Sequence, residues 1–159
     1  MNNDIKFNCE SHIFNYRVGI VIRNNNKILI EKNTNQDYLI LPGGKCKLGE
    51  SSIECAIREF KEETGISIEY VKTLGILENF FYSKYYNKDI HEMLIIHELK
   101  FTDDSLYNIN ILNNIEDKDY IKYEWIEIDK LNESNYKPFI TKEFLNTKNI
   151  IHKIYKDNI

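Results

Sequence analysis

The sequence predicts one α/β domain in which helices cover opposite faces of a mixed β-sheet. Two observations predict this class. Runs rich in β-branched and aromatic residues alternate along the chain with two helical patterns, and a glycine loop joins a strand to the first of these helices. The length of 159 residues suits a single domain, 1–159, that buries about two thirds of its surface.

The first part of the chain has the pattern of a β-hairpin followed by a short strand. The apolar runs 16–23 and 27–32 are joined by three asparagines at 24–26, which favour a turn. Residues 38–41 are typical of a short buried strand. The Pro-Gly-Gly segment 42–44 then interrupts the pattern, and its glycines allow the backbone to approach a ligand or ion closely.

A helix follows, and its own end signals predict both of its ends. Ser51 or Ser52 can cap it, Ser51 and Glu54 have the spacing of a capping box, and Gly65 is the residue type that usually ends a helix. The helix is therefore about fourteen residues long. One apolar stripe at steps of three and four faces the core, made of Ile53, Ala56, Ile57, Phe60 and Thr64.

The second half of the chain predicts another hairpin, a strand and a second helix. Segments 71–82 and 90–100 are strand-like, with a polar tip at 83–89 between them. Segment 122–128 is a further strand. Segment 139–156 has the spacing of an amphipathic helix.

Three glutamates near the end of the first helix lie where helix physics disfavours them. Glu59, Glu62 and Glu63 stand at i, i+3 and i+4, so their like charges are neighbours on one surface. They also occupy the last two turns, where the helix dipole favours Lys or Arg. A solvated charged face is the simplest explanation of such a run, whereas a bound divalent cation explains why both local preferences are violated at one place.

The residues around this cluster form a long fixed pattern that favours the second explanation. From Gly44, five residues lead to Glu50, seven more lead to Arg58, and an acidic run leads to Gly65. This segment, 44–66, resembles the Nudix box of the Nudix hydrolases. Every fixed position is present, and Phe60 is a mild departure because it stands where an aliphatic residue is usual.

The resemblance implies the three-layer α/β/α Nudix fold and assigns roles to residues. Glu59, Glu62, Glu63 and the backbone carbonyl of Gly44 are expected to hold Mg²⁺, with Mn²⁺ as a substitute. Glu50 is open between a further metal ligand and a surface acid near a helix N-terminus. Arg58 can pair with Glu54 or Glu62 at a spacing of four, and the family gives it the role of orienting the acidic residues.

The implied reaction is hydrolysis of a phosphoanhydride bond in a nucleoside diphosphate linked to another moiety. Candidate substrates are ADP-ribose, nucleotide sugars, dinucleoside polyphosphates and nucleoside triphosphates. The general base stays open between Glu59 or Glu62 in the box and Glu116 outside it, with Glu92 and Glu98 as further alternatives. A non-catalytic nucleotide or ADP-ribose sensor on the same fold is the competing function.

The aromatic residues Phe80, Phe81 and Tyr82 in the second hairpin are candidates to stack a base, although aromatic residues also favour strands for packing alone. The net charge of −4 and pI of about 5.6 argue against a non-specific nucleic-acid polymer or membrane partner. Three cysteines without metal spacing indicate reduced thiols and a cytoplasmic location. A homodimer stays open.

Overall fold

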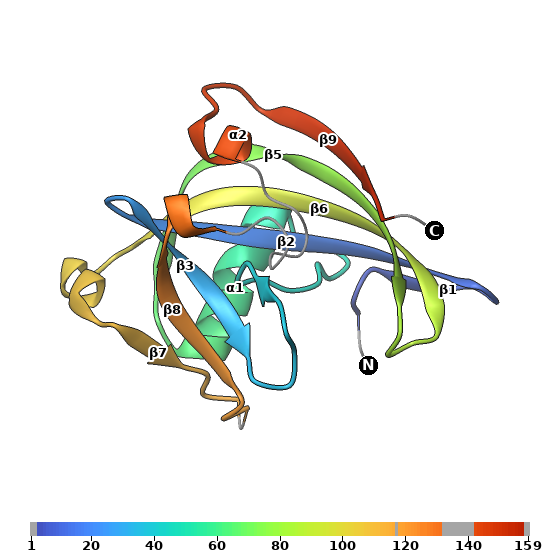
Figure 1. The fold of residues 1–159 in the computed structure, drawn as a ribbon, viewed down its shortest axis with the longest axis horizontal. Coiled ribbons are helices and arrows are strands. Elements are labelled where there is room, and N and C mark those ends of the chain that lie inside the picture. The colour runs from blue at the N-terminus through green and yellow to red at the C-terminus, as the bar shows by residue number, and fades with distance from the viewer. Residues whose placement is uncertain (1–2, 117, 132–141, 158–159) are drawn as a thin grey trace.

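The centre of the fold is a sheet of three long strands, β2 (His12–Asn24), β5 (Ile68–Ser83) and β6 (Lys88–Phe101). β5 and β6 pair antiparallel and confirm the predicted second hairpin, while β2 lies parallel to β6. The structure is a computed structural model of the chain, and it describes residues 3–116, 118–131 and 142–157 (Figure 1).

Shorter strands extend this sheet on both sides in the order β7-β8-β3-β2-β6-β5-β9, with β1 on β2 and β4 on β3. Their bounds are β1 (Lys6–Asn8), β3 (Lys27–Asn33), β4 (Leu39–Ile40), β7 (Ile111–Asn113), β8 (Ile121–Glu127) and β9 (Ile151–Lys156). The pairs β2–β6 and β5–β9 are parallel and the other pairs are antiparallel, so the sheet is mixed, as the sequence predicted.

β2 and β3 separate soon after their turn, and the glycine loop lies along β2 beyond that point. The two strands pair only at Arg23–Ile28 and Asn24–Lys27. Past these pairs, the backbone N–H groups of Val18 and Ile20 donate to the carbonyls of Gly44 and Pro42 at 3.0 and 2.8 Å. The loop thereby brings the start of the predicted motif to the edge of β2.

The first helix, α1 (Ser52–Thr64), forms where the sequence predicted it. Ser51 and Glu54 make the capping box, and Gly65 ends the helix in the left-handed conformation at φ 73°. The helix packs against one face of β2. The core between them includes Ala56 and Phe60 of α1 and the buried residues Val18, Ile20 and Ile22 of β2. α1 lies behind β2 and β3 in Figure 1.

The other face of the sheet carries a second core and a much shorter helix. α2 (Lys142–Asn146) buries Phe144 and Leu145 against Leu74 and Leu77 of β5. Helices therefore cover opposite faces of the mixed sheet, which confirms the α/β/α class. Two short 3₁₀ segments, η1 (Asp104–Asn108) and η2 (Ile128–Lys130), flank β7 and β8.

The prediction of one amphipathic helix over 139–156 is wrong. Residues 139–141 lie outside the described part of the chain, α2 covers only Lys142–Asn146, and Ile151–Lys156 is the strand β9, parallel to β5. Its exposure alternates from residue to residue, which is the period of a strand with one face on the protein. The open edge of β5 supplies the backbone partners that a sequence window does not show.

Candidate active site

The site begins where the glycine loop touches α1. A Cβ placed on Gly44 would lie 2.2 Å from the carboxylate of Glu59, so only glycine leaves room for that side chain. The carbonyl of Gly44 accepts from Val18 N–H at 3.0 Å, which leaves one lone pair of this oxygen available. Two of the predicted metal-binding residues are thus in direct contact.

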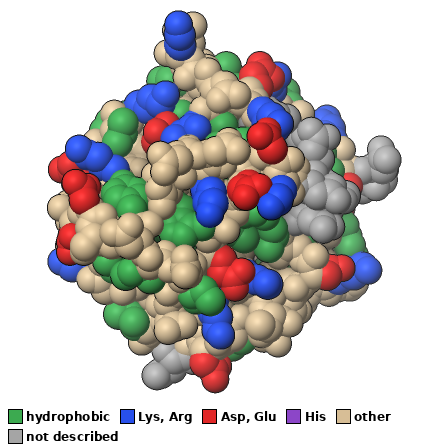
Figure 2. All heavy atoms as spheres, turned by 60° about the vertical axis from the view of Figure 1, so that its left-hand side comes forward, with side chains coloured by type: hydrophobic (Ala, Val, Ile, Leu, Met, Phe, Trp, Pro, Cys, Tyr) green, Lys and Arg blue, Asp and Glu red, His purple; other side chains and the backbone are tan. Residues whose placement is uncertain are grey.

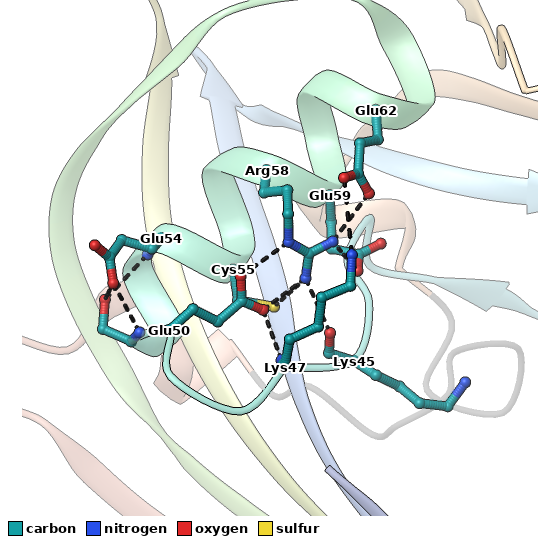
Figure 3. A network of polar contacts seen from close by, with 9 residues as sticks. Lys45, Lys47, Glu50, Glu54, Cys55, Arg58, Glu59 and Glu62 are labelled. Atoms are coloured by element: carbon teal, nitrogen blue, oxygen red, sulfur yellow. Dashed lines mark hydrogen bonds and ion pairs between the residues drawn. The ribbon is translucent and has the colours of Figure 1, made fainter. Parts of the chain in front are cut away.

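Arg58 lies among the predicted acidic residues and pairs with three of them (Figure 3). Its Nη1 donates to Glu59 Oε1 at 2.6 Å and to Glu62 Oε2 at 2.9 Å. Its Nε and Nη2 donate to the two oxygens of Glu50 at 2.9 and 2.6 Å. The chain therefore supplies one cation of its own that offsets the repulsion between Glu59 and Glu62, and the predicted pairing with Glu62 is present.

Glu50 has both oxygens engaged in this network. Besides Arg58, the backbone N–H of Lys47 donates to Glu50 Oε1 at 2.7 Å. The hydrogen bonds from Arg58 lower the pKa of Glu50 to about 2. This geometry favours a role in holding Arg58 and the loop, while direct metal binding by Glu50 stays a prediction.

Glu63 is buried although the predicted core stripe did not include it. Its side chain accepts from the Tyr123 hydroxyl at 2.8 Å, and the residue is only 8% exposed. Burial raises the pKa of Glu63 to about 7. Glu31 on β3 is 6% exposed, and burial followed by the charge of Glu63 raises its pKa to about 7 as well.

These carboxylates open into a cleft of about 600 Å³. Gly44, Glu59, Glu63 and Glu31 line one part of it, together with the cationic side chains of Arg17, Lys45 and Lys118. Sequence reasoning missed Glu31 and the three cations. The only signal for Glu31 was a carboxylate that directly follows the apolar run Ile28-Leu29-Ile30.

Glu116 lies beside the end of α1 and close to this cleft. The neighbouring Ile115 N–H donates to the carbonyl of Glu63 at 2.8 Å. The Glu116 carboxylate pairs with Lys118 Nζ at 2.9 Å, and Lys118 lines the cleft. The structure thus brings this loop to the site, whereas Glu98 lies elsewhere on β6 and pairs with Arg23 at 3.2 Å.

The three candidate base-stacking residues divide between two faces of β5. Phe81 lines the cleft, together with Tyr85 and Tyr86 from the hairpin tip. Phe80 stacks on His91 with ring centroids 4.3 Å apart, and Tyr82 donates to Asn87. Phe81 is therefore the one of the three that the described cleft contains.

The donor set fits a hard divalent cation. Glu59, Glu62, Glu63 and the Gly44 carbonyl are all oxygen donors, and Mg²⁺ needs only one or two protein carboxylates because it keeps several waters. In the part of the chain that the structure describes, no group of three His, Cys, Asp or Glu side chains forms a ready cage. Water and substrate phosphate oxygens would supply the remaining ligands of such an ion.

Comparison with known proteins agrees with the motif. A family model described as a NUDIX domain matches residues 14–146. Over 67 residues the chain is 38% identical to the RNA pyrophosphohydrolase of Ruthia magnifica subsp. Calyptogena magnifica, which is 42% of this chain and 37% of that protein. Over 59 residues it is 39% identical to the ADP-ribose pyrophosphatase of Methanocaldococcus jannaschii, 35% of each chain.

Solved structures support the fold. A NUDIX hydrolase of Nitrosomonas europaea superposes with a TM-score of 0.63 at 15% identity, over 90% of this chain and 79% of that one. The chain spans little more than a third of the two curated relatives named above. Among the described residues, no helix has the length and apolar character to cross a membrane.

Proposed function

The chain belongs to the Nudix family, and from this premise we propose that it is a divalent-metal-dependent pyrophosphohydrolase acting on a nucleoside diphosphate linked to another moiety. Enzymes of this family act on nucleotide-derived substrates and generally use a divalent metal. The observation that carries the proposal is the contact of Gly44 with Glu59 at the wall of a cleft that also holds Glu63.

Glu59, Glu62, Glu63 and the Gly44 carbonyl would hold Mg²⁺, with Mn²⁺ as a substitute. The ion supplies Lewis-acid polarisation of the phosphate and lowers the pKa of a bound water. Arg58 keeps Glu59 and Glu62 in place through its short hydrogen bonds. Lys45 and Lys118 line the same cleft and would attract phosphate oxygens, whereas Arg17 pairs with Glu92.

Glu59 is the best placed of the candidate bases. Glu59 and Glu92 both line the cleft, but only Glu59 of these two lies against Gly44. Glu62 is 44% exposed and pairs with Arg58 and Lys47. The Glu116 carboxylate forms an ion pair with Lys118, and it can act as a base only when that ion pair is broken. A base has to reach the attacking water, so position within the cleft counts for more than charge.

The volume of the cleft and the mixed charge of the surface favour a compact substrate. A cleft of about 600 Å³ is in the range of small-molecule sites. On the face drawn in Figure 2, basic and acidic side chains are interspersed and do not merge into one basic surface. Because one relative is named for RNA and another for ADP-ribose, we include both free nucleotides and RNA 5′ ends among the substrates to be tested.

We also propose a cellular location and an oligomeric state for the protein. Cys9, Cys46 and Cys55 are free thiols, which supports a reducing compartment such as the cytoplasm. A homodimer is proposed as well, and its test is the mass of the purified protein in solution at several concentrations.

The test is a substrate panel with purified protein and Mg²⁺. It contains ADP-ribose, nucleotide sugars, dinucleoside polyphosphates, nucleoside triphosphates and a short RNA with a 5′-triphosphate. We expect release of nucleotide or phosphate from at least one member. No release from any member would contradict the proposal, and calorimetric binding without consumption would indicate the sensor instead.

Two variants locate the reaction. Glu62→Gln and Glu63→Gln should each lower turnover by orders of magnitude while the circular dichroism spectrum stays that of the wild type. Glu69→Gln is the matched control, because Glu69 is exposed on β5 and, among the described residues, its ion-pair partner is Lys100 at 2.8 Å. Wild-type turnover in both site variants would remove the assignment.

A further inference from the structure

A row of three buried polar side chains runs across the sheet beneath the cleft, and two of them, Asn15 and Glu92, line the cleft. Glu92 on β6 is the register partner of Asn15 on β2 and of Asn79 on β5. The three residues are 2%, 7% and 5% exposed. The neighbouring pairs of β5 and β6 on the same face are apolar, with Ile90 beside Phe81 and Leu94 beside Leu77, while Arg17 of β2 lies beside Leu94.

This row has hydrogen-bonding capacity that the described residues do not use. The Oδ1 atoms of Asn15 and Asn79 have no partner in the described part of the chain. Glu92 accepts from Arg17 Nη1 at 3.3 Å and from Asn79 Nδ2 at 3.5 Å, and both contacts are longer than the usual 2.9–3.0 Å. A carboxylate accepts about four hydrogen bonds, so Glu92 retains free acceptor positions.

An aromatic wall stands next to the polar row. Phe81 lines the cleft, and Tyr85 and Tyr86 of the β5–β6 turn line it as well, with 88% and 42% of their surfaces exposed. Aromatic faces of this kind stack nucleobases. A buried carboxylate repels phosphate, so this part of the cleft suits a base with N–H donors and the part near Glu59 and Lys45 suits the phosphates.

We propose that this part of the cleft is the nucleobase subsite and that Glu92 makes it selective for guanine. Guanine presents two adjacent donors, N1–H and the N2 amino group, which match the two oxygens of one carboxylate. Adenine presents one amino donor beside an unprotonated ring nitrogen, whose lone pair faces the carboxylate unfavourably. The inference rests on the proposed function, since the base belongs to the nucleotide whose phosphates reach Glu59.

The competing explanation is that Glu92 only forms a structural ion pair with Arg17. In that case Glu92→Gln lowers stability, and the cleft has no preference between bases before or after the substitution. Base preference therefore separates the two explanations, whereas loss of stability alone does not.

The test is calorimetric binding of GMP, IMP and AMP in the presence of Mg²⁺. Monophosphates contain no phosphoanhydride, so the enzyme cannot consume them during the titration. We expect GMP to bind about 10- to 100-fold more tightly than AMP, the range for a good bidentate pair. IMP, which lacks the N2 amino group, should lie between the two. Equal affinities for GMP and AMP would overturn the proposal.

Glu92→Gln should reduce the preference for GMP over AMP to less than about threefold, because an amide offers only one acceptor. Glu98→Gln is the control: Glu98 also lies on β6 and pairs with an arginine, but it does not line the described cleft. Should Glu92→Gln fail to fold, 1-methyl-GMP decides with the wild type. This ligand has lost N1–H and should bind no better than AMP, and affinity equal to that of GMP counts against the proposal.

The source of the guanine is distinguished by turnover. A GDP-sugar and a 5′-triphosphorylated RNA beginning with G are each compared with their adenine counterparts. Guanine-selective binding without turnover would refute the proposed function and leave the subsite standing. Turnover with no preference for guanine in either comparison would refute the subsite and leave the function standing.

Discussion

Glu63 and Glu31 are two acids held out of water at the centre of the site. Tyr123 donates to Glu63 at 2.8 Å, and this bond opposes the rise in pKa that burial causes. Burial dominates at both residues, and each pKa lies at about 7 instead of 4.5. The two carboxylates repel each other when both are ionised, and either a bound cation or a proton on one of them reduces this repulsion.

These pKa values predict how the stability of the metal-free protein depends on pH. A carboxyl whose pKa is higher in the folded than in the unfolded state binds its proton more tightly when folded, so it stabilises the fold fully below pH 4.5. That contribution is lost as the pH rises through about 7. We expect the free energy of unfolding from urea titrations in EDTA to be lower at pH 8 than at pH 5.5. Glu31→Gln should flatten this dependence and Glu69→Gln should not, and a dependence of opposite sign in the wild type would contradict the assignment.

The contacts of Arg58 lead to a second prediction, which concerns turnover and stability when this side chain is replaced. Its planar guanidinium bonds Glu50, Glu59 and Glu62 at once, which the single ammonium of lysine does not reproduce. Arg58→Lys should therefore lower turnover at least tenfold and destabilise the fold by about 1–3 kcal/mol. Steady-state kinetics and urea unfolding measure the two effects separately. Wild-type turnover in Arg58→Lys would show that the three carboxylates keep their positions without it.

In the glycine loop, substitutions at two neighbouring positions should have different effects, one on folding and the other on activity. A Cβ on Gly43 would lie 2.1 Å from the backbone oxygen of Val18, and Gly43 has φ of +152°, so neither its backbone nor that of β2 can adjust. The three atoms nearest to a Cβ on Gly44 all belong to the flexible side chain of Glu59. We expect Gly43→Ala to lower the melting temperature strongly, and Gly44→Ala to keep a near-native melting temperature while turnover falls sharply. A Gly44→Ala variant with full turnover would separate Glu59 from the reaction.

Elements with local end signals were predicted well, and elements fixed by distant partners were not. α1 carries its cap and its stop within Ser51, Glu54 and Gly65, so its bounds follow from nearby residues. β9 was mistaken for a helix because only the open edge of β5 makes it a strand. Glu63 shows the same effect. The helix pattern predicts it outside the core, but Tyr123 of the distant strand β8 contacts it, and it is buried.

The cleft belongs to the whole molecule, because it forms where β2 and β3 separate. Arg17, Glu31 and Lys118 come from β2, β3 and the loop before β8, and no sequence window contains them together. The Nudix box identified the carboxylates of one wall. The other residues of the cleft are brought together by strand register, which a single sequence does not determine. Glu92, which carries the proposed base selectivity, is one of them.

Binding of the divalent cation should therefore appear as a change in the stability of the whole fold. A ligand that binds only the folded state at 100 times its Kd adds about 2.7 kcal/mol, which is roughly 5–10 °C in Tm for a domain of this size. We expect Mg²⁺ or Mn²⁺ to raise Tm by such an amount at pH 8, and by less at pH 5.5, where Glu63 with a pKa of about 7 must first release its proton. Differential scanning fluorimetry with NaCl at matched ionic strength measures this shift. Glu63→Gln should abolish it and Glu69→Gln should retain it, while an equal shift in both variants would place the cation away from α1.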